Sequence, residues 1–329
     1  MKLSKITGMY GDVRTFRPTT RLVDSDVDLG IEIELEGFHK YGNCQLQHPF
    51  WHVVDDGSLR NSGREFILTY RAHGGNYTPV RGLDFVTALD DWKKWLAVYI
   101  EKYAAPQTTK RTSIHVHVDV REMDVDQISR LILLYATFEP TLFALMNNGR
   151  EEEIYCMPFS KNWGGKVRAS GIINNSNSGS QVHAALHNAQ KYESMNIHSI
   201  VQRGSIEFRI HHGTTDIEEM IRWVNILLCL RRAAMDENIQ LMDYSTQASS
   251  IGLINFVGTV FKEYTPLVAE YLDEPLLLSG VRQAQDITQL FHIEKNHRSF
   301  ESMKAGKKAG EESILHQWAT ENSRKVYID

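Results

Sequence analysis

Four segments of this chain alternate between apolar and other residues with the period of a β-strand. They are residues 30–38 (GIEIELEGF), 64–70 (REFILTY), 113–120 (SIHVHVDV) and 205–212 (SIEFRIHH). Because successive side chains of a strand point to opposite faces, each segment gathers its apolar residues on one side. The pattern predicts a β-sheet that buries one face against a core.

The other face of these strands is unusually rich in ionisable residues. Along three of the strands it presents, in turn, Glu32, Glu34 and Glu36; His115, His117 and Asp119; and Glu207, Arg209 and His211. A solvent-facing sheet normally mixes Thr, Lys, Ser and Gln there. Like charges about 7 Å apart along one strand repel each other, so a cation should lie over the glutamates. Two Mg²⁺ ions would satisfy them, since hard cations bind carboxylate oxygens and tolerate a histidine.

Each of these patterns has a simpler interpretation when it stands alone. The glutamates could form a solvated strand face paired with Lys or Arg. His115 and His117 could lie on a sheet surface or in the core, or they could bind zinc in a hydrolase or a metal-stabilised binding module. Glutamates outnumber histidines in the cluster and no HExxH motif occurs, which favours Mg²⁺ over Zn²⁺. The joint occurrence of these faces on several strands indicates a convergent metal–phosphate site.

The segment DDGSLR (55–60) precedes the second strand and predicts a turn, because Asp-Gly is a turn signal. Asp55, Asp56 and Ser58 offer oxygen ligands or caps at this turn. Glu65 follows on the strand and adds a carboxylate to the cluster if its face matches. A plain turn is the simpler alternative.

Apolar residues recur at helical spacing between the strands. We expect helices over residues 83–103, from Asp124 or Asp126 to about Met146, and after a capping box formed by Thr215 and Glu218.

Residues 160–180 are rich in Gly, Ser and Asn and predict a long polar loop. This loop carries Lys161, Lys166 and Arg168 and could act as a mobile lid; a plain surface loop is the alternative.

We divide the chain into three parts: an N-terminal arm (1–28), a catalytic domain (29–242) and a C-terminal helical region (243–329) packed on it.

The composition is that of an ordinary globular protein with 36 basic and 41 acidic residues, a net charge of −5. This disfavours broad nucleic-acid binding, which needs a basic face. Cys44, Cys156 and Cys229 form no CxxC pair, which disfavours a disulfide scaffold and a structural zinc site. The N-terminus lacks the apolar run of a signal peptide, and the longest uncharged stretch, Tyr244 to Phe261, is too polar to span a bilayer. We therefore expect a soluble, cytoplasmic protein with no membrane partner.

Several segments, taken in order, resemble the amidoligase family, the carboxylate–amine ligases related to glutamine synthetase and glutamate–cysteine ligase. They are GIEIELEG, DGSL with GREF, SIHVHVDV, NNGREEEIYCMPFSK, and KYESMNIHSIVQRGSIEFRIHHGTTD followed by IRWVNILL. The resemblance extends from about Leu29 to Arg232. It implies an α+β fold of the glutamine synthetase type, with a curved, mostly antiparallel sheet, helices behind it and a funnel-shaped site. It also implies ATP- and Mg²⁺- or Mn²⁺-dependent amide formation through an acyl phosphate.

The resemblance implies a role for individual residues. The metal ligands it indicates are Glu32, Glu34, Glu65, His115 or His117, and Glu207. Arg209 would face the transferred phosphoryl group, with Glu34 also contributing to catalysis. The nucleotide or substrate would contact Lys191, Tyr192, Asn196 and Arg203, and the lid would bring Lys166 and Arg168. Asp55 or Asp56 could remove a proton from the amine, an assignment that rests on position alone.

Two other functions remain open at this stage. One is a kinase that phosphorylates a carboxylate or guanidino group and stops there. The other is the zinc-dependent hydrolase or binding module built on His115 and His117. For the ligase, we expect a small-molecule or peptide carboxylate and an amine as substrates. The net charge disfavours a base on nucleic acid without excluding it.

Overall fold

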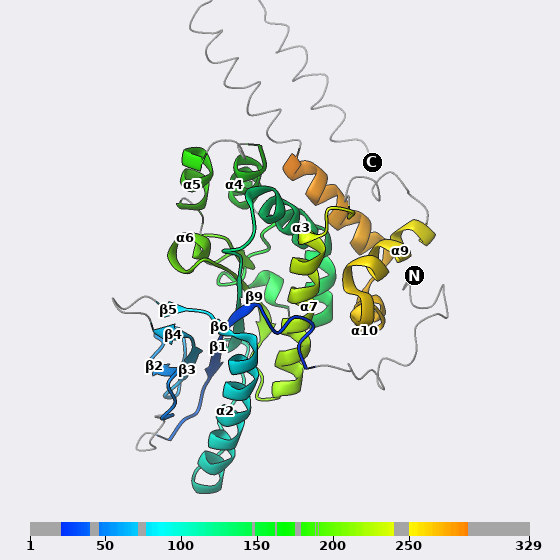
Figure 1. Ribbon diagram of the computed structural model, residues 1–329. Helices are drawn as coiled ribbons and strands as arrows, with labels where there is room; N and C mark the ends of the chain where they lie inside the picture. Colours follow the sequence, from blue (N-terminus) through cyan, green and yellow to red (C-terminus); the bar gives the residue numbers. More distant parts are fainter. Residues whose placement is uncertain are drawn as a thin grey trace, which may run out of the picture.

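The computed structural model describes residues 21–39, 46–71, 77–146, 149–161, 163–174, 179–187, 189, 191–239 and 250–288. Within these residues the chain forms an α+β fold, in which helices pack on an open sheet whose strand pairs are antiparallel (Figure 1). The α+β class and the mostly antiparallel sheet predicted from the sequence are therefore confirmed.

The main sheet has seven strands, in the order β2-β3-β1-β7-β9-β8, with β6 paired to the start of β1. The strands are β1 (Asp28–Leu35), β2 (Trp51–Val54), β3 (Arg64–Leu68), β6 (Val80–Arg81), β7 (Ser113–Asp119), β8 (Met195–Asn196) and β9 (Ser205–His212). A separate two-stranded sheet joins β4 (Tyr70–Arg71) and β5 (Tyr77–Thr78). All four predicted strands exist, with ends that differ by a few residues.

The apolar alternates of the strands form the buried core. Ile31, Ile33, Val116 and Phe208 are all fully buried. The helices that pack against this side of the sheet are α2 (Gly82–Lys102), α3 (Val125–Met146) and α7 (Ile217–Met235), which contact β1, β9 and β7 respectively. Burial of each large apolar side chain stabilises the fold by about 1.5–3 kcal/mol. The helices therefore hold one face of the sheet and leave the polar face to form a site.

Among the described helices, α3 alone is long and apolar enough to cross a membrane. Its most apolar stretch is 67% buried inside the fold. The helix packs among α7, α4 and α10, its inner stripe with Leu131 and Leu134 is buried, and Phe138 contacts the Phe256 and Phe261 rings of α9. This burial is that of a core helix.

The described part of the C-terminal region, residues 250–288, is mostly helical. It comprises α9 (Ser250–Phe261), η3 (Lys262–Tyr264), α10 (Thr265–Tyr271) and a further helix at 274–288. α9 contacts α7 and α10 contacts α3, so these helices cover the outer side of the helical layer (Figure 1). Most of the predicted arm, residues 1–20, lies outside the described residues.

The capping box predicted for α7 is wrong by one residue. The N-cap is Asp216, whose side chain accepts a hydrogen bond of 2.9 Å from the backbone N–H of Glu218. Thr215 makes no such cap; its neighbour Thr214 instead donates to the Glu219 carboxylate at 2.6 Å. An Asp at the cap also places a negative charge at the positive end of the helix dipole, which stabilises the helix.

The prediction of a long loop at 160–180 is also wrong. The chain forms α4 (Trp163–Asn174) and α5 (Gly179–His187), and η2 (Arg150–Glu152) precedes them. Ala169 and Ile172 are fully buried, and α4 packs on α3. Burial of this face outweighs the weak helix propensity of Gly, Ser and Asn.

Candidate functional site

A cavity of about 800 Å³ opens on the polar face of the sheet. Its floor is formed by side chains of β1, β3, β7, β8 and β9, and its walls come from residues 55–60, 110–111, 150–155 and 191–203. The lining includes most of the residues that the sequence assigned to metal or catalysis: Glu32, Glu34, Asp56, Glu65, His115, Glu207 and Arg209. Strands that are far apart in the sequence therefore meet at one cavity.

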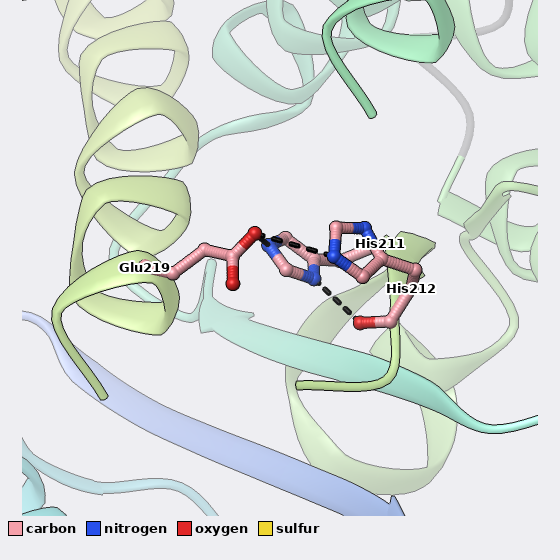
Figure 2. Close-up of side chains that lie close together, drawn as sticks. All are labelled: His211, His212 and Glu219. Carbon is pink, nitrogen blue, oxygen red and sulfur yellow. Dashed lines mark hydrogen bonds and ion pairs between the residues drawn. The ribbon is translucent and has the colours of Figure 1, made fainter. Parts of the chain in front are cut away.

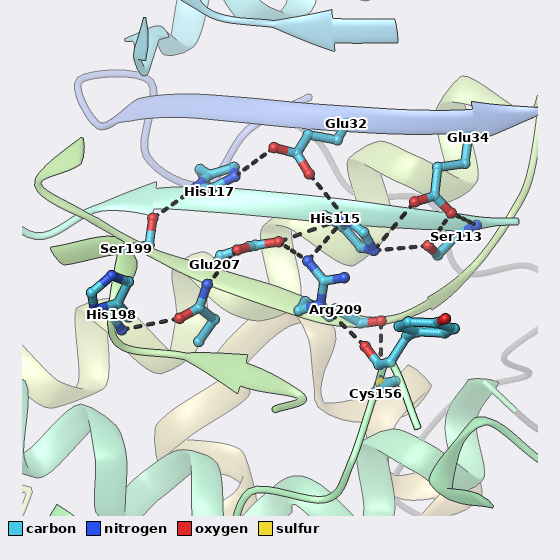
Figure 3. Close-up of polar contacts among 12 residues, drawn as sticks. Glu32, Glu34, Ser113, His115, His117, Cys156, His198, Ser199, Glu207 and Arg209 are labelled. Atoms are coloured by element: carbon cyan, nitrogen blue, oxygen red, sulfur yellow. Dashed lines mark hydrogen bonds and ion pairs between the residues drawn. The ribbon is translucent and has the colours of Figure 1, made fainter. Parts of the chain in front are cut away.

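Strand register explains this convergence. Glu34 on β1 lies opposite Glu65 on β3, and Glu32 on β1 lies opposite His115 on β7. Cross-strand partners share a face and have Cβ atoms about 4.5–5.5 Å apart. His117 and Glu207 form the next such pair, between β7 and β9. Figure 3 shows Glu32, Glu34, His115, His117 and Glu207 gathered above three neighbouring strands.

Glu32 is the most heavily bonded carboxylate in the cavity. Its Oε2 lies 2.9 Å from His115 Nδ1, and its Oε1 lies 3.2 Å from His117 Nε2 and 3.3 Å from an Arg203 Nη1. Burial by itself would raise the pKa of Glu32, but the hydrogen bonds from His115 and His117 outweigh burial and hold the pKa well below its usual value. Glu32 is therefore ionised in a nearly dry environment.

Glu207 is ionised for a similar reason. Burial acts to raise its pKa, but the charge of Arg209 outweighs this and the pKa is lowered. The Arg209 guanidinium donates to Glu207 Oε1, and Asn196 Nδ2 donates to Oε2 at 2.6 Å. Arg209 also donates from Nε to the Tyr155 carbonyl at 3.3 Å. These bonds hold the guanidinium over the cavity floor beside His115 (Figure 3).

The β1–β3 end of the cavity has a different character. Glu34 accepts hydrogen bonds from Ser113, at 2.9 Å from its N–H and 2.5 Å from its hydroxyl. Burial, followed by the charges of Glu32, Glu34 and Asp56, raises the pKa of Glu65 to about 9. In the absence of a cation, Glu65 therefore carries a proton at neutral pH.

Three overlapping groups of side chains in or directly beneath the cavity lining have the chemistry of a divalent-cation site. They are Glu32 with His117 and Glu207, Glu32 with Glu65 and His115, and Glu34 with Asp56 and Glu65; within each group the ligand atoms lie within 4.8 Å of one another. Carboxylate oxygens predominate, which fits Mg²⁺ or Mn²⁺. The crowding that protonates Glu65 is also what a cation would relieve.

The zinc interpretation of His115 and His117 gains no support from this geometry. In the described residues, no group of three close ligands contains both histidines. His117 does not line the cavity; it is buried between Glu32 and the hydroxyls of Ser199 and Ser205. The two histidines instead contact different oxygens of Glu32.

The polar face predicted for 205–212 breaks at a β-bulge. The register of β7 and β9 shifts between Ile114 and Val116, so that His211 pairs with Ile114. An extra residue in one strand re-aims the side chains that follow it. His211 therefore leaves the face of Glu207 and Arg209 and turns to the core side, 5.7 Å from the Trp223 ring of α7. The prediction that His211 shares the polar face is wrong.

Two further acidic alternates, Glu36 and Asp119, lie outside the cavity lining. Glu36 accepts a hydrogen bond of 2.7 Å from the N–H of Arg60 and pairs with Arg111. Asp119 pairs with Arg121 at 2.7 Å. Neither residue has a role in the resemblance described above, and each has a structural partner here.

Four residues predicted to contact nucleotide or substrate line the cavity, and two do not. Lys191, Tyr192, Asn196 and Arg203 are in the lining. Lys166 instead pairs with Asp286 at 2.9 Å, and the Arg168 guanidinium pairs with the buried Glu193. Because α4 is a helix packed on the fold, it carries Lys166 and Arg168 to these partners and away from the cavity.

Sequence reasoning missed several residues of the cavity wall. Arg60, Lys110, Arg111 and Tyr155 all line it. The Tyr155 and Tyr192 rings meet edge to face with centroids 5.3 Å apart, and Lys191 Nζ lies 4.9 Å from the Tyr192 centroid. Tyr155 belongs to the quoted segment NNGREEEIYC and Arg60 to the turn DDGSLR, so both had a usable signal. Lys110 and Arg111 come from a turn that carries no such signal.

The Cys156 thiol beside this aromatic pair is not a nucleophile. It is buried and donates to the Arg209 carbonyl at 3.3 Å. Burial raises the pKa of the thiol to about 11, so it stays protonated at neutral pH. Its contact supports the backbone of Arg209.

Residues 94–231 match a family model described as "Putative amidoligase enzyme". The match includes β7, β8 and β9, with His115, Glu207 and Arg209, and ends within α7. The resemblance to the amidoligase family is thereby confirmed over these residues. No curated protein matches the chain.

Proposed function

Because residues 94–231 match the family model of a putative amidoligase enzyme, we propose that the protein is a carbon–nitrogen ligase that joins a carboxylate to an amine with ATP and Mg²⁺ or Mn²⁺. The observation that carries the proposal is the convergence of carboxylates, the His115 imidazole and the Arg209 guanidinium from four adjacent strands in one cavity. We also propose that the sheet is of the glutamine synthetase type. The reaction would take place in the cytoplasm, which supplies ATP.

The chemistry accounts for this mixture of charges. A carboxylate is a poor electrophile, and transfer of the γ-phosphoryl group of ATP converts it to an acyl phosphate that an amine can attack. Catalysis of this transfer depends mainly on positioning and on charge stabilisation. Divalent ions held by the three ligand groups would neutralise the phosphate oxygens. Arg209 and Arg203 would donate to those oxygens from the β9 side.

The two candidate bases differ in their surroundings. Asp55 is exposed and its carboxylate already pairs with Arg64. Asp56 lines the cavity close enough to raise the pKa of Glu65, and its side chain accepts a bond of 2.7 Å from the Ser58 N–H. Both residues line the cavity, but among the described residues Asp56 has no ion-pair partner, so we assign proton removal from the amine to Asp56.

The aromatic pair at the cavity wall is the best position for the nucleotide base. Large aromatic rings are usually buried, but Tyr155 is 45% exposed and Tyr192 is 38% exposed beside the cavity. A purine ring could cover this surface, since exposed aromatic faces favour stacking. Lys191 over the Tyr192 ring would then lie near the phosphates.

The first test is nucleotide binding, because it does not require the substrates to be known. Binding of a non-hydrolysable ATP analogue, measured by calorimetry, should require Mg²⁺ or Mn²⁺. Arg209→Ala and Glu34→Gln should weaken it at least about tenfold. Asp119→Asn is the matched control, because it neutralises an acid of the same sheet outside the cavity. If the wild-type protein binds no analogue with either ion, the proposal is wrong.

The second test identifies the reaction. The protein is incubated with ATP, Mg²⁺ and mixtures of carboxylates and amines, including amino acids and peptides, and the products are weighed by mass spectrometry. A ligase releases ADP and phosphate and forms a product that has lost one water. A stable product that retains the phosphoryl group would instead identify the kinase alternative, which needs the same cavity.

A further inference from the structure

We propose that His211, His212 and Glu219 form a separate binding site for a transition-metal ion of the Zn²⁺ type, at the junction of β9 and α7. His211 and His212 end β9, and Glu219 lies in the first turn of α7 (Figure 2). None of the three lines the cavity. The proposal therefore does not depend on the proposed ligase activity.

The ligand atoms are close enough for one ion. Glu219 Oε1 lies 3.2 Å from His212 Nε2 and 4.0 Å from His211 Nε2, and all the ligand atoms lie within 4.8 Å of one another. Tetrahedral zinc with bonds of about 2.0–2.1 Å separates its ligand atoms by roughly 3.3 Å. Side-chain shifts of roughly 1 Å would therefore complete the site.

The protein already fixes the tautomer of His211 that a metal requires. His211 Nδ1 donates to the His212 carbonyl at 2.7 Å, which leaves a lone pair on Nε2. This lone pair faces the carboxylate of Glu219, and two acceptors cannot bond to each other. Among the described residues no donor reaches His211 Nε2. A backbone carbonyl bound to the far nitrogen is the usual support of a metal-binding histidine.

Glu219 is oriented in the same way. The Thr214 hydroxyl donates to Oε2 at 2.6 Å, so that Oε1 is the oxygen turned toward the two imidazoles. The His212 ring has no competing bond at its other nitrogen, since Nδ1 is buried without a hydrogen-bond partner in the part of the chain that the structure describes. The three side chains thus place His211 Nε2, His212 Nε2 and Glu219 Oε1 around one point, where a metal ion would replace the proton that His212 Nε2 shares with Glu219.

The surroundings leave a route for the ion. The His211 side chain is 1% exposed, whereas those of His212 and Glu219 are 37% and 31% exposed. An ion can therefore reach the site from solvent on the side of His212, and water can fill the remaining coordination position. Two imidazoles and one carboxylate suit Zn²⁺, Co²⁺ or Ni²⁺, while the oxygen-rich cavity suits Mg²⁺.

The alternative is that a protonated His212 and Glu219 merely form an ion pair that joins the strand to the helix. The experiment that separates the two is a Zn²⁺ titration of the chelator-treated full-length protein, by calorimetry, with excess Mg²⁺ present to compete in the cavity. We expect one saturable equivalent of Zn²⁺ that His212→Gln and Glu219→Gln each weaken at least about tenfold. Co²⁺ in place of Zn²⁺ should give the visible absorption of a tetrahedral site.

The control variants are His183→Gln, which removes a histidine on α5, and Glu34→Gln in the cavity. Both should still bind one saturable equivalent of Zn²⁺. Circular dichroism checks that each variant is folded. If His212→Gln does not fold, Glu219→Gln alone provides the test. Absence of saturable Zn²⁺ binding overturns the proposal. So does binding that persists in both His212→Gln and Glu219→Gln, or binding that Glu34→Gln removes, because the ion would then occupy the cavity.

Discussion

The two ends of the cavity balance their negative charge differently. At the β7–β9 end the protein supplies its own hydrogen-bonding partners: the imidazoles of His115 and His117 bond to Glu32, and the guanidinium of Arg209 bonds to Glu207. At the β1–β3 end, Glu34, Glu65 and Asp56 form a ligand group made only of carboxylates. Among the described residues, no Lys or Arg forms an ion pair with any of the three.

The pKa values follow this difference. Glu32 and Glu207 have lowered pKa values although both are buried, because the hydrogen bonds of His115 and His117 to Glu32 and the charge of Arg209 beside Glu207 outweigh burial. Burial and neighbouring carboxylates raise the pKa of Glu65 to about 9. The comparison indicates that the β1–β3 end is the part of the site where a cation from solution is most needed. The β7–β9 end is already ordered before any ligand arrives.

The largest effect should follow from Arg209→Ala. Loss of the guanidinium removes the donor proposed for the transferred phosphoryl group, and turnover should fall by about 10²–10³-fold. It also leaves the Glu207 carboxylate buried without its main partner, which should lower the free energy of unfolding by about 3–5 kcal/mol. Steady-state kinetics and urea denaturation measure the two quantities.

A double variant separates those two effects. Arg209→Met combined with Glu207→Gln removes both charges, so the free energy of unfolding should recover most of the loss while turnover stays low. If the double variant regains wild-type turnover, Arg209 contributes only structure and the catalytic assignment is wrong.

Glu65→Gln tests the β1–β3 end. Glu65 carries a proton at neutral pH in the metal-free protein, so a neutral Gln should leave the free energy of unfolding without metal nearly unchanged. Mg²⁺ affinity should fall at least about tenfold, because a ligand is lost. Calorimetric titration with Mg²⁺ measures this, with Asp119→Asn as the control. An unchanged Mg²⁺ affinity would mean that the cation does not bind at this end.

Strand alternation was sufficient to predict most of the cavity floor. Glu32, Glu34 and His115 lie where a period of two residues places them, because hydrophobic burial of the opposite face fixes strand orientation. His211 does not, because the bulge in β9 depends on its pairing with β7 and leaves no local signal. Ala169 and Ile172 show a similar limit: burial against the rest of the fold makes α4 a helix despite a loop-like composition.

Glu193 extends the comparison to a buried carboxylate outside the cavity. Burial raises its pKa to about 7, an effect that the charge of Arg168 only partly offsets. A carboxyl whose pKa is raised on folding binds its proton more tightly in the folded state, so it stabilises the fold at low pH. The free energy of unfolding should therefore fall between about pH 4.5 and pH 7, by up to about 3 kcal/mol.

Glu193→Gln should flatten that pH dependence, because the amide cannot titrate. The measurement is urea denaturation of the wild type and the variant at intervals across this pH range, with the double variant Arg168→Met and Glu193→Gln to remove the unpaired guanidinium. If the wild type and both variants show the same slope, Glu193 is ionised throughout and its partner outweighs its burial.

The smallest loss of unfolding free energy among the destabilising variants should be that of His212→Gln, a residue of β9 that follows the bulge. The ion pair of His212 with Glu219 is partly exposed, so without metal its loss should cost about 0.5–1 kcal/mol. With Zn²⁺ at about 100 times its dissociation constant, the wild type gains about 2.7 kcal/mol that the variant lacks. Thermal unfolding with and without Zn²⁺ measures this difference. If the stability difference between the wild type and His212→Gln does not increase with Zn²⁺, His212 and Glu219 form only an ion pair. The cavity would then be the one candidate cation site in the described part of the chain.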